Sequence, residues 1–253
     1  ARGISVSLPV TFPDAKGSGR FAVQELVYDD RLHLGATGKI HRTGPAAVDF
    51  DGAVQMPDVA DLSIAFTGNA GLSPDPHVKV AVESERFRFS AFRFENLLPA
   101  GGWSADYDFD VTAKGSFLWN NNQVTTEGEL VIHDGTLTLP DMDMTAAGIK
   151  GTLAMKDLVN PASLPGQVLT IDEIRAGDFA FSDAHIRFTL EADQHLVVEN
   201  IRVKWCSGLV STESVRFPSS DGSVSMTVYC DRIQLNQLLE QLGGLQSRGK
   251  GTL

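Results

Sequence analysis

Apolar residues occupy every second position along much of the chain, and this alternation constrains the fold more than any other feature. It is clearest at 4–12, 78–82, 103–111 and 186–190, where polar, charged or small residues fill the intervening positions. Successive side chains of a β-strand point to opposite faces of a sheet, so each run predicts a strand with one apolar face. Such strands are typical of antiparallel sheets. Helical crossover patterns between the runs are missing, and the sequence therefore predicts an all-β fold.

Four short segments carry residues that favour tight turns between such strands. They are Asp51-Gly52, Asp134-Gly135, Asp221-Gly222 and the Pro-Asp-Pro run at 74–76. Asp-Gly pairs tolerate the positive φ angles of two-residue hairpins, and Pro cannot continue a sheet ladder. We predict a turn at each of the four.

One segment departs from the alternation. Within 233–242, Leu235, Leu238, Leu239 and Leu242 are spaced i, i+3, i+4 and i+7, which is the spacing of an amphipathic helix. Gly243-Gly244 follows as a stop signal. We predict a short helix near 235–242 that covers the end or the open face of a sheet. A helix that binds a partner is the alternative.

Proline and glycine interrupt the strand pattern between Met155 and Gln167, at Asn160-Pro161 and Leu164-Pro165-Gly166. This predicts two parts, 1–155 and 156–253, that continue one sheet. The chain starts without an initiator Met and ends at Gly251-Thr252-Leu253, where a strand could begin. We expect it to be a piece of a longer protein.

The composition limits the partners of the chain. It has 253 residues, of which 42% are apolar, so it can bury a sizeable core. Lys and Arg number 21 against 32 Asp and Glu, a net charge of −11. This charge disfavours nucleic acid and a polybasic membrane patch. No apolar run reaches the roughly 18 to 20 residues that span a bilayer, so we expect no transmembrane segment here.

The motifs of common enzymes and metal sites are missing. The six histidines are scattered, and the sequence has no HExxH, GxSxG, P-loop or dinucleotide motif. Asp106, Asp108 and Asp110 resemble the start of a calcium loop, but Val111 and Phe117 stand where Gly and Glu are needed. We therefore expect no catalytic residue, no metal and no cofactor, and a chain that is not an enzyme.

The two cysteines, Cys206 and Cys230, leave two interpretations open. Residues 201–210 and 223–232 both read as strands, and a hairpin centred near Pro218 would place the cysteines opposite each other. A bulge at Trp205-Cys206 would be needed to bring them to one face. A disulfide would then fit an oxidising compartment. The other interpretation is two buried free thiols, because free Cys packs as a small apolar residue.

The second half of the chain carries a recognisable series of segments. They are Gly148-Ile149-Lys150-Gly151-Thr152-Leu153, Ala176-Gly177-Asp178-Phe179, Trp205-Cys206-Ser207-Gly208, the Leu235–Leu242 helix and Gly249-Lys250-Gly251-Thr252-Leu253. This series resembles the C-terminal region of YdbH-like proteins, within the AsmA-like group of bacterial envelope proteins. Small residues, often Gly, usually follow the Trp in that family, and Cys206 and Ser207 depart from this. The matching segments span about 145–253. Residues 1–144 resemble the family only in their pattern of alternating strands.

The resemblance implies an elongated, curved, mostly antiparallel sheet folded around an open apolar groove, a β-taco. Family members are anchored in the inner membrane of Gram-negative bacteria and reach across the periplasm. They are implicated in carrying phospholipid to the outer membrane, with a small outer-membrane lipoprotein as partner. The resemblance therefore implies a periplasmic segment of a bridge for phospholipid, whose acyl chains lie in the groove.

The alternating strands nominate residues for the lining of that groove. The candidates are Ile4, Val6, Val80, Phe89, Phe109, Phe188, Val198 and Val203. Each lies in a strand whose other face is polar, so register sends them to one side. The same alternation would line a closed β-sandwich, and a structural or ligand-binding envelope module is the alternative function. A hydrolase with an unmarked carboxylate pair is a third interpretation, without positive evidence.

Overall fold

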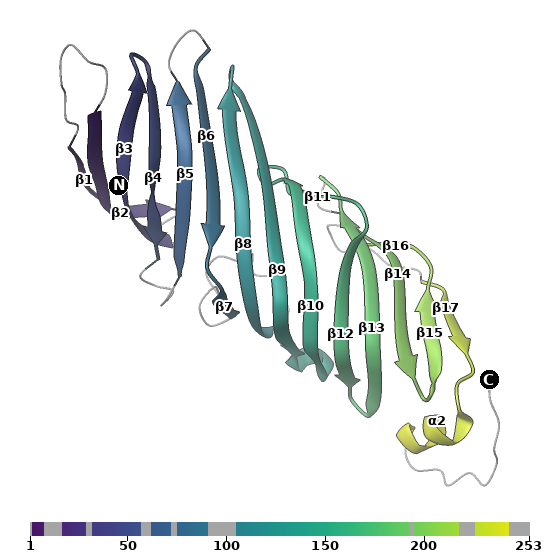
Figure 1. Ribbon diagram of the computed structural model, residues 1–253. Helices are drawn as coiled ribbons and strands as arrows, with labels where there is room; N and C mark the ends of the chain where they lie inside the picture. Colours follow the sequence, from purple (N-terminus) through teal and green to yellow (C-terminus); the bar gives the residue numbers. More distant parts are fainter. Residues whose placement is uncertain are drawn as a thin grey trace. The chain divides into compact units, whose positions relative to one another are not determined.

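The computed structural model describes residues 2–7, 17–28, 32–56, 62–71, 75–90, 105–192, 195–217 and 226–242. These residues form strands of a single antiparallel sheet and one short α-helix, which confirms the predicted all-β class (Figure 1). The chain divides into two compact units. Unit 1 comprises 1–87, 93–99 and 112–129, and unit 2 comprises 88–92, 100–111 and 130–253.

Unit 1 is an antiparallel meander in which neighbours in sequence are neighbours in the sheet. Its strands are β1 (Arg2–Ser7), β2 (Gly17–Tyr28), β3 (Leu32–Gly44), β4 (Ala47–Gln55), β5 (Ser63–Gly71) and β6 (His77–Ser84). Residues 112–120 of β8 (Asp106–Asn120) and 123–129 of β9 (Gln123–Leu139) complete it. Each strand from β1 to β5 pairs with the next, and β6 pairs with β8.

Unit 2 continues this style of hairpins. Its strands are most of β7 (Phe87–Ser90), the remaining parts of β8 and β9, β10 (Met144–Asp157), β11 (Ala162–Ser163), β12 (Gln167–Ala176), β13 (Phe179–Leu190), β14 (Leu196–Trp205), β15 (Gly208–Thr212), β16 (Val215–Phe217) and β17 (Val228–Asp231). A short 3-10 helix, η1 (Pro140–Met142), links β9 to β10, and the helix α2 (Leu235–Gln241) follows β17. β12 lies between β10 and β13, and β14 pairs with β13, β15 and β16.

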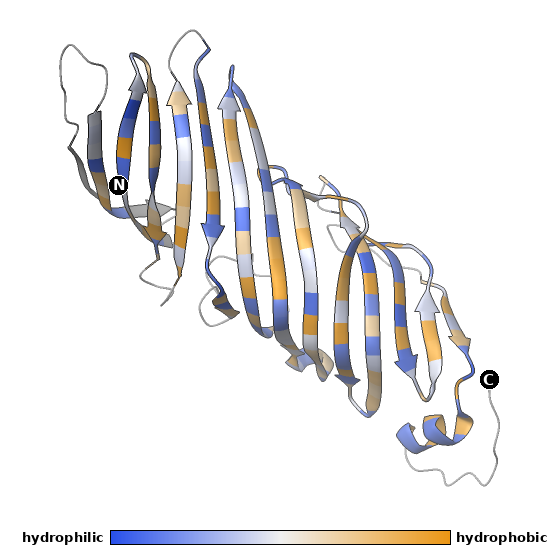
Figure 2. Ribbon diagram, viewed as in Figure 1, coloured by the Kyte–Doolittle hydropathy of each residue, from blue (hydrophilic) through white to orange (hydrophobic). Residues whose placement is uncertain are grey.

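Hydropathy alternates along the strands, as the sequence pattern predicts (Figure 2). In β5, for example, Ile64 and Phe66 are half-buried while Ser63, Ala65 and Thr67 are exposed. Residues paired across antiparallel strands share a face, so the register carries this polarity from strand to strand.

Two of the four predicted turns are wrong. Asp51-Gly52 lies inside β4 and Asp134-Gly135 inside β9. Gly52 faces Gly38 on β3, and a side chain there would collide with the ring of Phe66 on β5. Glycine serves packing at these sites instead of a turn. The third turn, Asp221-Gly222, lies outside the described residues. The fourth agrees in part, since Asp75 and Pro76 precede β6.

The tight turns lie elsewhere, at residues with positive φ. Asn121 (φ 47°) and Asn122 (φ 62°) join β8 to β9, and Cys206 (φ 45°) and Ser207 (φ 61°) join β14 to β15. Positive φ at both central residues is the geometry of the type I′ hairpin. Gly177 (φ 56°) begins the turn between β12 and β13.

The predicted helix is confirmed as α2, with Leu235, Leu238 and Leu239 half-buried and Leu242 exposed just after its end. The predicted boundary between 155 and 156 falls inside β10, within unit 2. The division of the sheet into two successive parts, 1–155 and 156–253, stays a prediction.

Candidate functional site

The register of unit 1 places apolar residues in four rows on one face of the sheet. Three rows, called here the floor rows, hold Val23, Ala36, Val54, Ile64 and Ser84; Phe21, Gly38, Gly52, Phe66, Val82 and Gly115; and Gly19, Ile40, Phe50, Gly68, Val80 and Phe117. The fourth, called the rim row, runs within two residues of the strand ends and holds Gly17, Arg42, Val48, Ala70, Val78 and Trp119.

Three phenyl rings lie over glycines of neighbouring strands in the floor rows. A Cβ on Gly38 would lie 2.6 Å from the ring of Phe21, and one on Gly52 would lie 2.6 Å from Phe66 Cζ. Gly68 is covered in the same way by Phe50. The ring centroids of Phe21 and Phe66 are 6.0 Å apart, and those of Phe50 and Phe66 are 6.3 Å apart. Glycine thus lets the rings lie close to the backbone and form a continuous aromatic surface.

This apolar face remains open to solvent. No Val, Ile, Phe or Trp of the four rows is buried, and Val82 and Phe117 are each 37% exposed. The centre of a closed sandwich would bury such side chains almost fully. The exposure in unit 1 therefore favours a surface available to an apolar ligand.

The opposite face of the sheet is polar and carries cross-strand ion pairs. Lys114 Nζ lies 2.8 Å from Glu129 Oε1, and Lys150 Nζ lies 2.8 Å from Asp172 Oδ2. The hydrogen bonds to these carboxylates raise the pKa of both lysines, so the lysines stay charged at neutral pH. Exposed pairs of this kind add little stability, but they keep this face hydrated.

The apolar face of unit 2 contains a small buried core. Ala146, Ile149, Ile171 and Ala184 are buried together. Partly buried side chains pack around them, namely Phe109, Leu137, Leu169, Ile174, Ile186 and Val203. Next to this cluster, Phe89 stacks on Tyr107 with centroids 5.2 Å apart, and Tyr107 stacks on Phe109 at 5.8 Å. Burial raises the pKa of the Tyr107 hydroxyl, whose oxygen finds no hydrogen-bond partner among the described residues.

A segment around β11 packs at one end of the β10–β13 hairpins in unit 2. Ser163 Oγ accepts a hydrogen bond from the N–H of Leu190 at 2.9 Å, and the N–H of Leu164 donates to the carbonyl of Ala154 at 2.8 Å. Gln167 joins this segment to β10, because its side chain bonds both the N–H of Ala154 and the carbonyl of Leu164.

Helix α2 contacts unit 2 at the end of the sheet that contains the β14–β15 turn. Trp205 Nε1 donates to Gln241 Oε1 at 2.9 Å, and the N–H of Gln234 donates to the carbonyl of Cys206 at 3.0 Å. The Trp205 ring in turn contacts the rings of Phe179 and Phe181, with centroids 5.9 and 5.6 Å away. The helix therefore covers one end of the unit 2 strands, as the sequence predicts.

The candidate lining residues of unit 1 either lie opposite members of the floor rows on the neighbouring strand or belong to a floor row themselves. Ile4 pairs with Val23 and Val6 with Phe21, while Val80 is itself a member of a floor row. This is the placement that the alternation predicts. Their role toward a ligand stays a prediction.

The candidates of unit 2 gather on its apolar face. Phe109 and Val203 pack on the buried cluster, Phe89 joins the aromatic stack, and Phe188 pairs directly with Val198. A register shift between Arg187 and Phe188 keeps Phe188 and Ile186 opposite apolar partners on β14. Val198 is 5% exposed, so it belongs to the core and offers less surface than the others.

The expected pairing of the cysteines is wrong. The segments that carry the cysteines do pair, as β15 with β17, but Cys230 lies opposite Val210. Cys206 lies in the turn between β14 and β15, and residues 218–225 are outside the described part of the chain. Both cysteines are free, with Cys206 buried and Cys230 exposed. The alternative of two buried thiols agrees for Cys206 and not for Cys230. The redox state of the pair stays a prediction. Burial raises the pKa of the Cys206 thiol.

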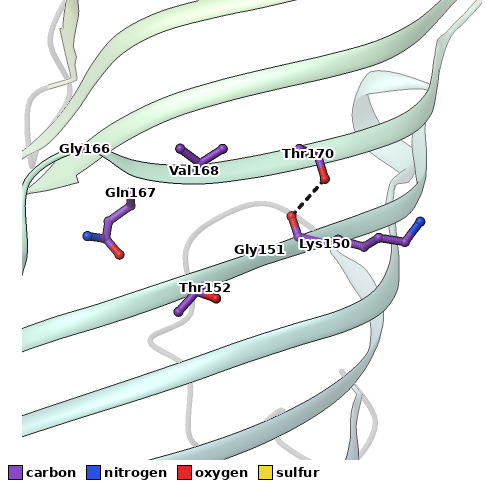
Figure 3. A pocket seen from close by; sticks show the side chains of 7 residues that line it. All are labelled: Lys150, Gly151, Thr152, Gly166, Gln167, Val168 and Thr170. Atoms are coloured by element: carbon purple, nitrogen blue, oxygen red, sulfur yellow. Dashed lines mark hydrogen bonds between the residues drawn. The ribbon is translucent and has the colours of Figure 1, made fainter.

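A shallow depression of about 430 Å³ lies between β10 and β12 (Figure 3). Seven residues line it: Lys150, Gly151, Thr152, Gly166, Gln167, Val168 and Thr170. Several of its polar groups already have partners within the protein, and Thr170 Oγ1, for example, donates to the carbonyl of Lys150 at 3.3 Å. Lys150 Nζ in turn contacts Asp172. We assign this depression no function.

Sequence reasoning missed two features of the site. The first is the set of glycines beneath phenyl rings, which strand patterns count as interruptions. A Phe at the paired position of the neighbouring strand is the signal that would identify them. The second is Arg42, the single charged residue in the four rows of unit 1. Within the described ranges, no group of three His, Cys, Asp or Glu residues could hold a metal, and no helix has the length and apolarity to cross a membrane.

Comparison with known families identifies the chain. The model of the YdbH-like family, described as intermembrane phospholipid transport protein YdbH, matches residues 21–253. No curated protein and no solved structure matches. The family match covers most of both units, and the chain therefore belongs to the YdbH-like family.

Proposed function

We propose that this member of the YdbH-like family is a segment of a bridge that carries phospholipid between the inner and outer membranes. The observation that carries the proposal is the open apolar face of unit 1, where Phe21, Phe50 and Phe66 remain half-buried with no layer of described residues closing over them. The family match supports phospholipid as the cargo.

An apolar surface of this kind suits the energetics of moving a lipid. Burying one methylene contributes roughly 0.8 kcal/mol, so a sixteen-carbon acyl chain contributes on the order of 12 kcal/mol. A lipid that crosses water loses all of this at once. A lipid that slides along a row of Phe, Val and Ile exchanges one apolar contact for another, and no step requires the full transfer free energy.

The polarity of the two faces fits a location between membranes. Ion pairs such as Lys114–Glu129 keep one face in water, while the acyl chain occupies the other. We propose that the segment lies in the periplasm of a Gram-negative cell, as part of a protein anchored in the inner membrane. A small outer-membrane lipoprotein is the proposed partner at the far end. The cargo needs no cofactor and no chemical step.

Native mass spectrometry of the purified chain tests the proposal directly. The chain is incubated with vesicles of phosphatidylethanolamine and phosphatidylglycerol, reisolated, and its mass measured. We expect retained phospholipid, and less of it in Phe66→Asp, which places a charge in a floor row. Thr67→Asp, one residue along on the polar face, is the matched control. A wild-type chain that retains no lipid would contradict the proposal and favour a structural or ligand-binding β module.

A further inference from the structure

The strands of unit 1 segregate charge almost completely between the two faces. Arg20, Lys39, Asp51 and Lys79 occupy the polar face, in positions that alternate with the floor rows. Within the four rows Arg42 is the exception, because it pairs with Gly17 and Val48 in the rim row and follows Gly38 and Ile40 at two-residue spacing. A cation thus lies at the border of a surface made of Gly, Ala, Val, Ile, Phe and Trp.

The contacts of Arg42 leave its charge uncompensated. Its Nε donates to the carbonyl of Gly44 at 3.1 Å, and its Nη2 donates to the carbonyl of Pro45 at 3.0 Å. Both acceptors are neutral groups of the turn between β3 and β4. Within the part of the chain that the structure describes, no carboxylate forms an ion pair with this guanidinium. Three of its five N–H donors remain available.

The position of Arg42 matches the two-part chemistry of a phospholipid. The two turn carbonyls hold the guanidinium at the end of the strands, and the floor rows begin two residues away with Ile40 and Phe50. A guanidinium binds phosphate through paired, charge-assisted hydrogen bonds. An acyl chain on the floor rows would place its phosphate at this border. Trp119, at the other end of the rim row, is also a residue that prefers the boundary between apolar and wet surroundings.

We propose that Arg42 binds the phosphate of a phospholipid whose acyl chain lies on the floor rows of unit 1. The inference rests on the proposed function and adds a headgroup contact to it. It makes Arg42 a binding residue for anionic diester phosphate, and it predicts that this part of the surface distinguishes phospholipids from neutral diacylglycerols.

Calorimetric titration of the whole chain with short-chain soluble lipids tests this inference. The probes are diheptanoyl phosphatidylglycerol, diheptanoylglycerol, which lacks the phosphate, and inorganic phosphate. We expect Arg42→Gln to weaken binding of the phosphatidylglycerol about ten-fold and to leave diheptanoylglycerol unchanged. Arg42→Lys, which keeps the charge but loses the planar fork, should recover most of the affinity. Arg20→Gln is the matched control, because it removes the same charge from the exposed polar face.

Three results would overturn the inference. Undiminished phosphatidylglycerol binding by Arg42→Gln would show that Arg42 does not contact the phosphate. An equal loss for diheptanoylglycerol shows that Arg42 acts through packing. Binding of inorganic phosphate as tight as that of the lipid makes this an anion site without a role for the floor rows. Wild-type binding of phosphatidylglycerol with no effect of Arg42→Gln would leave the proposed function standing, whereas a wild-type chain that binds neither lipid would remove both.

Folding is followed in parallel, because Arg42→Gln also removes two hydrogen bonds to the β3–β4 turn. Circular dichroism melting curves show whether each variant is folded at the assay temperature. If Arg42→Gln is unfolded, the salt dependence of lipid binding by the wild-type chain tests the inference instead. Affinity for phosphatidylglycerol should then fall with ionic strength while affinity for diheptanoylglycerol does not, in both the wild type and Arg20→Gln. Equal salt dependence for the two lipids would contradict the inference.

Discussion

At the scale of single residues, the glycines of unit 1 set how closely aromatic rings approach the sheet. A Cβ at position 52 would meet the carbonyl oxygen of Thr37 and would lie 2.6 Å from Phe66 Cζ. The backbone cannot move without disturbing β3 and β4, and the ring is itself held between Phe21 and Phe50. Glycine at this position is therefore part of the aromatic surface and not a weakness of the strand.

This packing predicts that Gly52→Ala destabilises the chain by about 1–3 kcal/mol through overpacking. Gly44→Ala is the matched control, because the nearest atom to a Cβ there is Ala47 Cβ at 3.7 Å, an ordinary contact. Its free energy of unfolding should stay within about 0.5 kcal/mol of the wild type. Urea denaturation measures both. Equal effects of the two substitutions would contradict the account of the ring packing.

The two thiols should differ in reactivity, because Cys230 is exposed and Cys206 is buried. Burial also raises the pKa of the Cys206 thiol and so lowers its thiolate fraction. Ellman's reagent should therefore titrate one thiol per chain in buffer and two in denaturant. A chain with no free thiol in denaturant would carry a disulfide, and the placement of Cys206 in the β14–β15 turn would be wrong.

At the scale of elements, α2 makes polar contacts to the sheet along its whole length. Gln241 Oε1 accepts from Trp205 Nε1, and Ser207 Oγ bonds Gln237 Oε1 at 3.0 Å. We predict that Gln241→Ala lowers the free energy of unfolding by roughly 1 kcal/mol, because the indole N–H loses its partner. Glu240→Ala, at an exposed position of the same helix, is the control and should have little effect. Thermal unfolding followed by Trp fluorescence measures the difference.

The same scale shows what the sequence could and could not predict. Alternation within one strand predicts its polarity, so strands such as β5 and β13 and the helix α2 follow from local pattern. The turns are harder to predict, because Asp-Gly occurs both in hairpin turns and within strands where an aromatic ring lies over the glycine. Gly135 lies beneath the ring of Phe109, which belongs to β8. The residues next to Gly135 in sequence give no information on which ring packs over it, because that depends on the register between strands. The two central residues of the β14–β15 turn, Cys206 and Ser207, include no Gly, Asn or Asp, so the usual signal of a two-residue hairpin is missing there.

The site follows the same division. Membership of the apolar face was predictable, because Val80 and Phe188 alternate with polar neighbours. Exposure was not predictable, because it depends on what packs over the face. Val198 is buried while Phe117 is 37% exposed, although both lie in apolar alternation. Arg42 escaped notice because one charge in a strand normally marks the polar face; it becomes unusual once register places it beside Val48.

At the scale of the whole molecule, lipid passage requires that the part of the apolar face in contact with the acyl chain carry no charge, whereas a cation such as Arg42 is compatible with its border. A charge there would meet an acyl chain in poorly hydrated surroundings, at a cost of several kcal/mol. Phe109 and Phe188 both lie on the apolar face of unit 2 and are half-buried, so an Asp at either position would still reach water. The substitution should then act on transport more than on folding.

We therefore predict that Phe109→Asp or Phe188→Asp in the full-length protein blocks phospholipid passage while the protein remains folded. Val168→Asp is the matched control, because it makes the same apolar-to-acidic change at a residue that pairs with Thr152 and Arg187 on the polar face and is 47% exposed. Transfer of labelled phospholipid between vesicles, with circular dichroism of each variant, provides the measurement. Loss of folding in the two Phe variants would indicate a closed core, and undiminished transfer in folded variants would show that lipid does not travel on this face.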